Sequence, residues 1–357
     1  MNKQGNGLNR FAMIFAVLAL GVLGVLGLRT AGQPVLAAAG PGYHVINSYK
    51  LGGIGGWDYL IADPDSRRVY ITRGSHVMVV DADSGKVVGD IADTPGVHGV
   101  ALAPELGKGF TSNGGENMVS VFDLKTLKTL SKIKVGERPD AILYDPHSKR
   151  VFTFNAKSED TTAVDAEKGT VAGTIPLGGK PEFAASDGKG DMFVNIEDKG
   201  EIVSFDPVKL TVKARWKLAG CEEPSGLGFD RKHRRLFPTC GNKVMPVVNA
   251  DNGKIVQTVA ICDGPDAGGF DDDNQLAFAS CGDGTLTVIK EESPDKYSVA
   301  ENATTKKRAR TMTFDSKTHQ VYLVTAEVGA APAPTAEQPH PRPSMVPGSF
   351  ELFVMGK

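Results

Sequence analysis

The chain has 357 residues, with 40 Lys and Arg against 42 Asp and Glu and a formal net charge of −2 at pH 7. Such a balance creates no basic field to attract nucleic acid, so we expect no general nucleic-acid binding. The one basic cluster comprises Lys306, Lys307, Arg308 and Arg310. We interpret it as a solvated loop between the last two repeats described below.

The first 39 residues have the layout of an export signal. Lys3 and Arg10 precede an apolar stretch over residues 11–28. Three alanines at 37–39 then offer a small-residue cleavage site, and we therefore predict a signal peptide over residues 1–39. Because an apolar stretch of 18 residues is also long enough to span a bilayer, the alternative is an uncleaved anchor, the only case in which we expect membrane contact. Both interpretations place the rest of the chain in the periplasm or outside the cell.

Beyond this segment, short apolar runs end in a turn at nearly constant intervals. The turn residues are Asp63, Ala103, Asp145, Asp187, Asp230, Asp271 and Asp315, spaced by 40, 42, 42, 43, 41 and 44 residues. A period of roughly 40 to 45 residues with several short strands in each unit is typical of a β-propeller with four-stranded blades. The sequence therefore predicts an all-β protein, a seven-bladed β-propeller over residues 40–357.

The third repeat illustrates the expected blade. Its four strands are predicted at residues 139–144, 150–154, 162–165 and 169–175. Asp145 and Pro146 favour the first turn, because proline fixes φ and the aspartate side chain bonds to nearby backbone. The Val, Ile, Thr and Phe residues between the turns suit a pleated sheet.

The last repeat lacks one strand. It supplies strands only at residues 310–314, 320–325 and 350–355, whereas residues 43–51 form a spare strand ahead of the first inner strand, expected near Trp57. We predict that the spare strand adds as the outer strand of the last blade and closes the ring. An unpaired edge at that place would invite aggregation.

Four cysteines occur in two consecutive repeats with the same spacing. Cys221 and Cys262 precede inner strands, and each is followed 19 residues later by another cysteine, Cys240 and Cys281 respectively. In an exported chain this matched offset predicts the disulfides Cys221–Cys240 and Cys262–Cys281. A metal site made of all four thiolates is the alternative, although structural zinc sites usually have their cysteines in close C-x-x-C pairs.

The repeats also share short motifs. These are Arg-Pro-Asp at 138–140, Gly-Pro-Asp at 264–266, Val-Tyr-Ile-Thr at 69–72, Val-Phe-Thr-Phe at 151–154, and the stretches 79–88, 309–315 and 318–323. They resemble YVTN-repeat propellers, and the chain from about residue 43 to 357 is similar to the YncE-like family of exported seven-bladed proteins. Ala103-Pro104 and Asp187-Gly188 depart from the usual turn. The resemblance implies fold and compartment, because its motifs are structural rather than catalytic.

The residue five positions before each turn residue is expected at one mouth of the central channel. These channel-mouth residues are Asp58, His98, Asp140, Glu182, Ser225, Asp266 and Arg310. Converging carboxylates attract a cation or a polar ligand, and crowding raises some of their pKa values. The alternative is a wet mouth without a ligand, in which Arg310 pairs with Asp58 or Asp266. Trp57 is either a stacking platform at this mouth or packs between blades.

A proline-rich insertion separates the second and third strands of the last repeat, over residues 327–349. Its prolines are Pro332, Pro334, Pro339, Pro341, Pro343 and Pro347. Because proline favours extended structure, we expect a semi-rigid cover over the channel mouth that offers His340 and Arg342 to a ligand. A surface loop without a role is the alternative.

No common catalytic motif is present in the sequence, and two classes of function remain. The first, which we favour, is a non-catalytic binding or scaffold protein of the cell envelope that holds a small polar ligand, a cation or a protein partner at the channel mouth. The second is a lactonase-type hydrolase, as similar propellers support, with His98 or Glu182 as general base and Arg310 stabilising the oxyanion. A divalent cation, the one cofactor considered, would be held by Asp58, Asp140 or Asp266.

Overall fold

A computed structural model describes residues 42–53, 55–331 and 344–357 of the protein. The predicted signal peptide or anchor over residues 1–39 lies outside the described residues, as do His340, Arg342 and the centre of the proline-rich insertion. No helix in the described part of the chain has the length and apolar character needed to cross a membrane.

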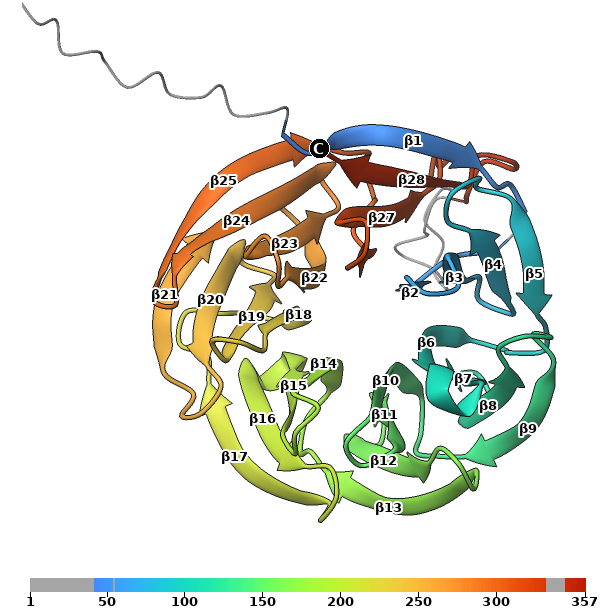
Figure 1. Ribbon diagram of the computed structural model, residues 1–357, viewed down its shortest axis with the longest axis horizontal. Coiled ribbons are helices and arrows are strands. Elements are labelled where there is room, and N and C mark those ends of the chain that lie inside the picture. The colour runs from blue at the N-terminus through green and yellow to red at the C-terminus, as the bar shows by residue number, and fades with distance from the viewer. Residues whose placement is uncertain (1–41, 54, 332–343) are drawn as a thin grey trace, which may run out of the picture. The chain divides into compact units, whose positions relative to one another are not determined.

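The described residues contain 28 strands in seven antiparallel sheets of four, set around a ring as blades (Figure 1). Blade 1 consists of β2 (Leu60–Asp63), β3 (Arg68–Thr72), β4 (Val77–Asp81) and β5 (Val87–Ile91). Blade 2 consists of β6 (Val97–Ala103), β7 (Lys108–Asn113), β8 (Met118–Asp123) and β9 (Thr129–Lys134). Blades 3 and 4 are β10 (Pro139–Asp145), β11 (Arg150–Asn155), β12 (Asp160–Asp165) and β13 (Thr170–Pro176), then β14 (Pro181–Ser186), β15 (Met192–Ile196), β16 (Glu201–Asp206) and β17 (Thr211–Lys217).

Blades 5 and 6 are β18 (Pro224–Asp230), β19 (Arg235–Cys240), β20 (Val244–Asn249) and β21 (Ile255–Ala260), then β22 (Pro265–Asp271), β23 (Leu276–Cys281), β24 (Thr285–Ser293) and β25 (Lys296–Thr304). Blade 7 is β26 (Met312–Asp315), β27 (Gln320–Thr325), β28 (Glu351–Gly356) and β1 (His44–Lys50). The predicted seven-bladed, all-β propeller is confirmed.

The turn aspartate at the end of the inner strand explains the regular repeat. In blade 1 the Asp63 carboxylate accepts hydrogen bonds from the backbone N–H groups of Asp65 and Ser66, at 3.1 and 3.2 Å. This side chain fixes the reversal between the first and second strands. Blade 2 has Ala103 at this place, and a single turn of 3-10 helix, η1 (Pro104–Leu106), makes the reversal instead.

The hydrophobic core lies between the blades. Phe152 of blade 3 packs against Phe205 of blade 4 with ring centroids 5.6 Å apart, and Phe193 of blade 4 packs against Phe229 of blade 5 at 5.5 Å. These rings come from the Val-, Ile- and Phe-rich strands predicted from the sequence. Burial of this surface between neighbours couples the sheets into one ring.

Ring closure follows the prediction. β1 pairs with β28 as the outer strand of blade 7 (Figure 1). Tyr43, just before β1, packs edge-on against Phe278 of blade 6 at 5.4 Å, and its hydroxyl donates to the His319 carbonyl at 3.2 Å. The start of the described chain therefore contacts blades 6 and 7. Through β1, it also pairs with β28, the last strand of the chain.

Both predicted disulfides, Cys221–Cys240 and Cys262–Cys281, are present. Each joins the segment ahead of an inner strand to the end of the next strand in the same blade. The alternative of a metal site built from all four thiolates is therefore wrong, because every sulfur is already bonded.

Two inner strands begin later than predicted. β2 begins at Leu60 rather than near Trp57, and β26 begins at Met312 rather than Arg310. Ahead of β2, the Tyr59 N–H donates to the His98 carbonyl of blade 2 at 3.1 Å, and ahead of β26, the Arg310 carbonyl accepts from the Ala267 N–H of blade 6 at 3.2 Å. The inner strands thereby start at the channel mouth, close to the candidate site.

Candidate functional site

Six of the seven channel-mouth residues lie at the start of the inner strands with side chains that remain partly exposed. Their exposed fractions range from 12% for Glu182 to 59% for Arg310. Ser225 differs, because it is only 9% exposed and its hydroxyl lies 3.3 Å from the Thr239 hydroxyl within blade 5. Ser225 is therefore not part of the exposed mouth.

Three of these side chains, from blades 1, 2 and 3, converge and are called here the mouth triad: Asp58, His98 and Asp140. The His98 Nδ1 atom lies 2.6 Å from Asp58 Oδ2 and 3.6 Å from Asp140 Oδ1. Their ligand atoms all lie within 4.8 Å of one another. Desolvation lowers the pKa of His98, but the hydrogen bond to Asp58 and the charges of both carboxylates outweigh it, so the net shift of this pKa is upward. The triad is a compact group of one imidazole and two carboxylates.

The other carboxylates of the mouth have basic partners. Glu182 pairs with Lys180 at 2.8 Å, and Asp266 pairs with the Arg310 Nε at 3.2 Å, which is one of the two pairings expected for Arg310. Burial, followed by the charge of Asp140, raises the pKa of Glu182 to about 7. Burial also raises the pKa of Asp266 to about 7 despite Arg310. Asp266 thus lies with Arg310 and not in the mouth triad.

A tyrosine that was not singled out from the sequence lies among these acids. The Tyr59 ring, from blade 1, contacts Phe183 of blade 4 with centroids 4.5 Å apart, and its hydroxyl lies 3.4 Å from Glu182 Oε2. Burial and then the charges of Asp140, Glu182, Asp58 and Asp266 raise the pKa of Tyr59 well above its usual value. The pair thus joins blades 1 and 4 across the ring.

The repeat alignment carries a signal for this pair. The residue after each channel-mouth position is Tyr59, Gly99, Ala141, Phe183, Gly226, Ala267 or Thr311. Only blades 1 and 4 place an aromatic ring there, and small residues elsewhere leave room for both rings. Comparison of these seven positions would have indicated the contact.

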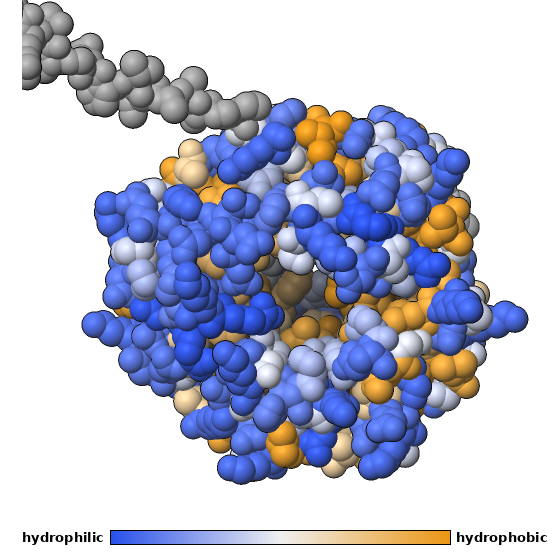
Figure 2. Space-filling model, viewed as in Figure 1, coloured by the Kyte–Doolittle hydropathy of each residue, from blue (hydrophilic) through white to orange (hydrophobic). Residues whose placement is uncertain are grey.

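An apolar cavity of about 240 Å³ lies inside the ring near these rings. Its lining includes Tyr59, Phe183, Ala141, Gly268 and Met312, from the inner strands of five blades. The opening at the centre of the ring is visible in Figure 2. Because this lining is mainly apolar, the polar groups available to a charged ligand are those at the channel mouth.

Two further features border the mouth. Trp57 packs against Phe350 of blade 7 with centroids 5.5 Å apart, which favours the interpretation that it packs between blades. The described ends of the insertion form a short stem, in which Gly329 N–H donates to the Ser344 carbonyl at 2.9 Å and Val346 N–H donates to the Glu327 carbonyl at 2.8 Å. The stem leaves from the end of β27, on the mouth side of the blade.

Comparison with known proteins supports the fold. No family model matches the sequence, and no curated protein matches it. Among solved structures, the chain is similar to the hydrazine synthase of Kuenenia stuttgartiensis, with a TM-score of 0.66, 15% identity, and coverage of 76% of this chain and 92% of that chain.

Two other similar structures are those of U3-55K and of a mitotic checkpoint complex. The U3-55K structure has a TM-score of 0.69 and 7% identity, with coverage of 87% of this chain and 98% of that chain. The mitotic checkpoint complex chain has a TM-score of 0.72 and 14% identity, with coverage of 98% and 99%. At such identities the likeness shows a common propeller architecture, which hosts unrelated functions.

Proposed function

We propose that this protein is a non-catalytic binding propeller of the cell envelope that holds a divalent cation at its channel mouth. The observation that carries the proposal is the convergence of Asp58, His98 and Asp140 from three blades. The export-signal layout and two disulfides support a periplasmic or secreted location. The motifs shared with YVTN-repeat, YncE-like propellers agree with this compartment.

The donor set favours a first-row transition metal over Ca²⁺ or Mg²⁺. An imidazole nitrogen with two carboxylates suits Zn²⁺ or Mn²⁺, whereas Ca²⁺ and Mg²⁺ prefer oxygen ligands alone. Each ligand stands in an inner strand or just ahead of one, so the packed ring holds the three side chains in place before the cation arrives. The partly exposed side of such a cation would face the channel opening and bind a polar ligand or a loop of a protein partner.

Replacement of Asp140 tests this proposal. In equilibrium dialysis with Mn²⁺, we expect the purified full chain to bind the ion and Asp140→Asn to bind at least about 100-fold more weakly, since even outer-shell losses weaken metal sites by 10- to 100-fold. Glu182→Gln, in the adjacent blade 4 but outside the mouth triad, is the matched control and should retain the ion within a few-fold. Equal binding by wild type and Asp140→Asn would contradict the proposal.

The two mouth acids outside the triad, Glu182 and Asp266, predict a pH effect on the metal-free protein. The pKa values of Glu182 and Asp266 are raised to about 7 in the folded state, above those of exposed carboxyls, so folding favours their protonated forms. Their contribution to stability is therefore present at low pH and is lost as pH rises toward 8. Both side chains keep some contact with channel water, which limits the size of this contribution to stability.

We expect the Tm measured in EDTA to be higher at pH 5 than at pH 8, and Glu182→Gln combined with Asp266→Asn to reduce this difference. Carboxylates of the surface turns such as Asp81, whose pKa is lowered by hydrogen bonds from Ser84, titrate below this window. The comparison with the double variant isolates the two mouth acids. A wild-type Tm difference that the double variant reproduces in full would show that these acids do not cause it.

A lactonase-type hydrolase is the second candidate, and the raised pKa of Glu182 favours it. A carboxyl with a pKa about 7 can accept a proton at neutral pH and act as general base. His98 is the alternative base, because an imidazole whose Nδ1 is held by carboxylates can accept a proton at Nε2. Lactone hydrolysis that depends on Glu182 and Arg310 would support this candidate over the binding protein.

A further inference from the structure

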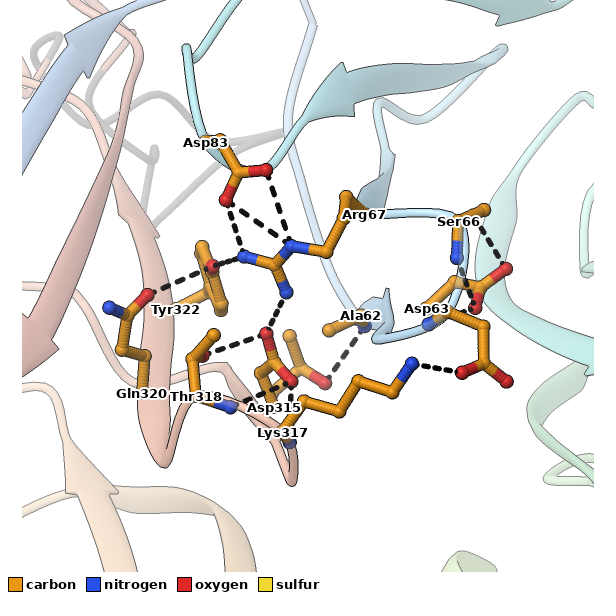
Figure 3. Close-up of polar contacts among 12 residues, drawn as sticks. Ala62, Asp63, Ser66, Arg67, Asp83, Asp315, Lys317, Thr318, Gln320 and Tyr322 are labelled. Carbon is orange, nitrogen blue, oxygen red and sulfur yellow. Dashed lines mark hydrogen bonds and ion pairs between the residues drawn. The ribbon is translucent and has the colours of Figure 1, made fainter.

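A second acidic cluster lies on the face of the propeller opposite the channel mouth, at one of the joints where neighbouring blades meet. At three of the seven joints in the described ring, the turn aspartate of one blade meets a nitrogen-bearing side chain of the next. Arg67 of blade 1 donates to Asp315 of blade 7 and also binds Asp83 at 2.6 Å (Figure 3). Arg234 of blade 5 binds Asp187 of blade 4 at 3.0 Å.

His319 of blade 7 meets Asp271 of blade 6 in the same way, at 3.1 Å. Arg67, Arg234 and His319 occupy equivalent places just before the second strand, with φ of 54°, 55° and 56°. The next blade thus supplies nitrogen donors to the buried aspartate at these three joints. Gln275, with φ of 54°, occupies the equivalent place in blade 6 and has no charge to offer Asp230 of blade 5.

Blade 6 also adds a second acid, Glu291, to the joint between blades 5 and 6. The Glu291 N–H donates to the Gln275 carbonyl at 3.0 Å. In other blades the equivalent backbone bond is made by Ala82, Ala166 and Ala250. Glutamate therefore stands where these blades have alanine. Asp230 and Glu291 are 1% and 2% exposed, and burying two carboxylates without a compensating cation is costly.

The third departure from the repeat is His233. Its place in the turn is taken in other blades by Ser66, Asn274 and Thr318, whose side chains donate to their own turn aspartate. His233 Nδ1 lies 2.9 Å from Asp230 Oδ2 and 2.8 Å from Glu291 Oε1. One Nδ1 atom carries at most one proton, and its hydrogen-bond geometry is satisfied toward Asp230.

Glu291 is consequently left without a hydrogen-bond donor. Neither of its carboxylate oxygens has one among the described residues. Arg235, two residues after His233, directs its nitrogens elsewhere, to the carbonyls of Pro294 and His233 and to the Asp295 carboxylate. A buried carboxylate in this state is stabilised by a nearby positive charge, and the neighbouring His233 nitrogen is already engaged by Asp230.

We propose that Asp230, His233 and Glu291, called here the joint triad, bind a divalent metal ion of the Zn²⁺ class that links blade 5 to blade 6. Their ligand atoms all lie within 4.8 Å of one another, and one imidazole with two carboxylates is a donor set that Zn²⁺ accepts in proteins. The His233 side chain is 22% exposed, which gives the ion an entry path and room for water as a fourth ligand. The metal supplies the positive charge that Arg67 and Arg234 supply at two other joints. This site uses none of the residues of the mouth triad.

Zinc binding by single-site variants tests the proposal. In the Asp140→Asn background, where the mouth triad is disabled, we expect dialysis to retain one Zn²⁺ per chain and added Zn²⁺ to raise the Tm of the EDTA-treated protein. Adding Glu291→Ala or His233→Ser should weaken this binding at least about 100-fold and abolish the rise in Tm. Both replacements introduce residues that other blades carry at these places, so the fold is expected to survive.

The two candidate metal sites are distinguished by the same set of proteins. Glu291→Ala alone should retain Zn²⁺ at the mouth triad if that site exists, and the variant should be at least as stable as wild type in EDTA because a buried, unpaired carboxylate has been removed. Failure of the Asp140→Asn protein to bind Zn²⁺ at millimolar concentration would overturn the proposal. Unchanged affinity after both Glu291→Ala and His233→Ser would overturn it equally.

Discussion

Deletion of residues 43–51 is expected to lower the Tm by at least about 10 °C, or to prevent folding altogether. The deletion removes β1, so β28 becomes an unpaired edge at the place where the ring closes. It also removes Tyr43 from its contacts with Phe278 and the His319 carbonyl. Thermal unfolding followed by circular dichroism measures the effect, together with the oligomeric state of the truncated chain.

A synthetic peptide provides the control for this deletion. Residues 42–51 supplied as a separate peptide should bind the truncated chain and raise its Tm, whereas a scrambled peptide of the same composition should not. If the truncated chain unfolds at the wild-type temperature, closure of blade 7 by β1 contributes little and our account of the ring is incorrect.

Removal of the disulfides is the second change with a large expected effect. Replacing both cysteines of either pair by serine should lower the free energy of unfolding by about 3 kcal/mol in the chain-entropy model, and the loss of both pairs by about 6 kcal/mol. Each bridge closes a segment with a sequence separation of 19 residues. The bridges lie in different blades, 5 and 6, so we expect the two losses to add.

Guanidinium unfolding of the wild type, Cys221→Ser/Cys240→Ser, Cys262→Ser/Cys281→Ser and the quadruple variant measures these losses. Reductant should bring the wild type to the stability of the quadruple variant and leave that variant unchanged. A quadruple variant whose unfolding midpoint equals that of the oxidised wild type would mean that the bridges do not stabilise the propeller.

The fold could be predicted because its causes are local and repeated. The turn aspartates bond to backbone N–H groups two to four residues away, as Asp63, Asp145 and Asp187 do, so the same residues recur wherever the chain must reverse. The matched positions of the cysteines and the spare strand at residues 43–51 follow from the same count of repeats. Where Ala103 departs from the turn pattern, η1 replaces the missing carboxylate. At the second departure, Asp187 keeps its carboxylate and accepts from the N–H groups of Lys189 and Asp191.

The candidate sites could be predicted only in part, because they depend on contacts across the ring. The repeat positions Asp58, His98 and Asp140 at the start of three inner strands, but side-chain direction decides that these three converge while Ser225 turns into its blade. The contact of Tyr59 with Phe183 joins residues of blades 1 and 4, so only comparison of equivalent positions in all seven repeats could indicate it.

The joint triad shows how the repeats could be used further. His233 and Glu291 stand where other blades have a small hydroxyl or amide residue and alanine, respectively. Alignment of all strands of every blade, rather than of the inner strands alone, exposes both replacements. Their meeting at one joint, however, requires the register of β24 against β23 and the packing of blade 6 on blade 5.

The most direct test of the proposed function is a crystal structure of the protein grown with Mn²⁺ and measured at a wavelength where manganese scatters anomalously. We predict an anomalous peak at the channel mouth within bonding distance of Asp58, His98 and Asp140, and no such peak in crystals of Asp140→Asn. Crystals of the wild type in which the mouth triad lacks a peak while other sites bind Mn²⁺ would contradict a cation-binding role for the channel mouth.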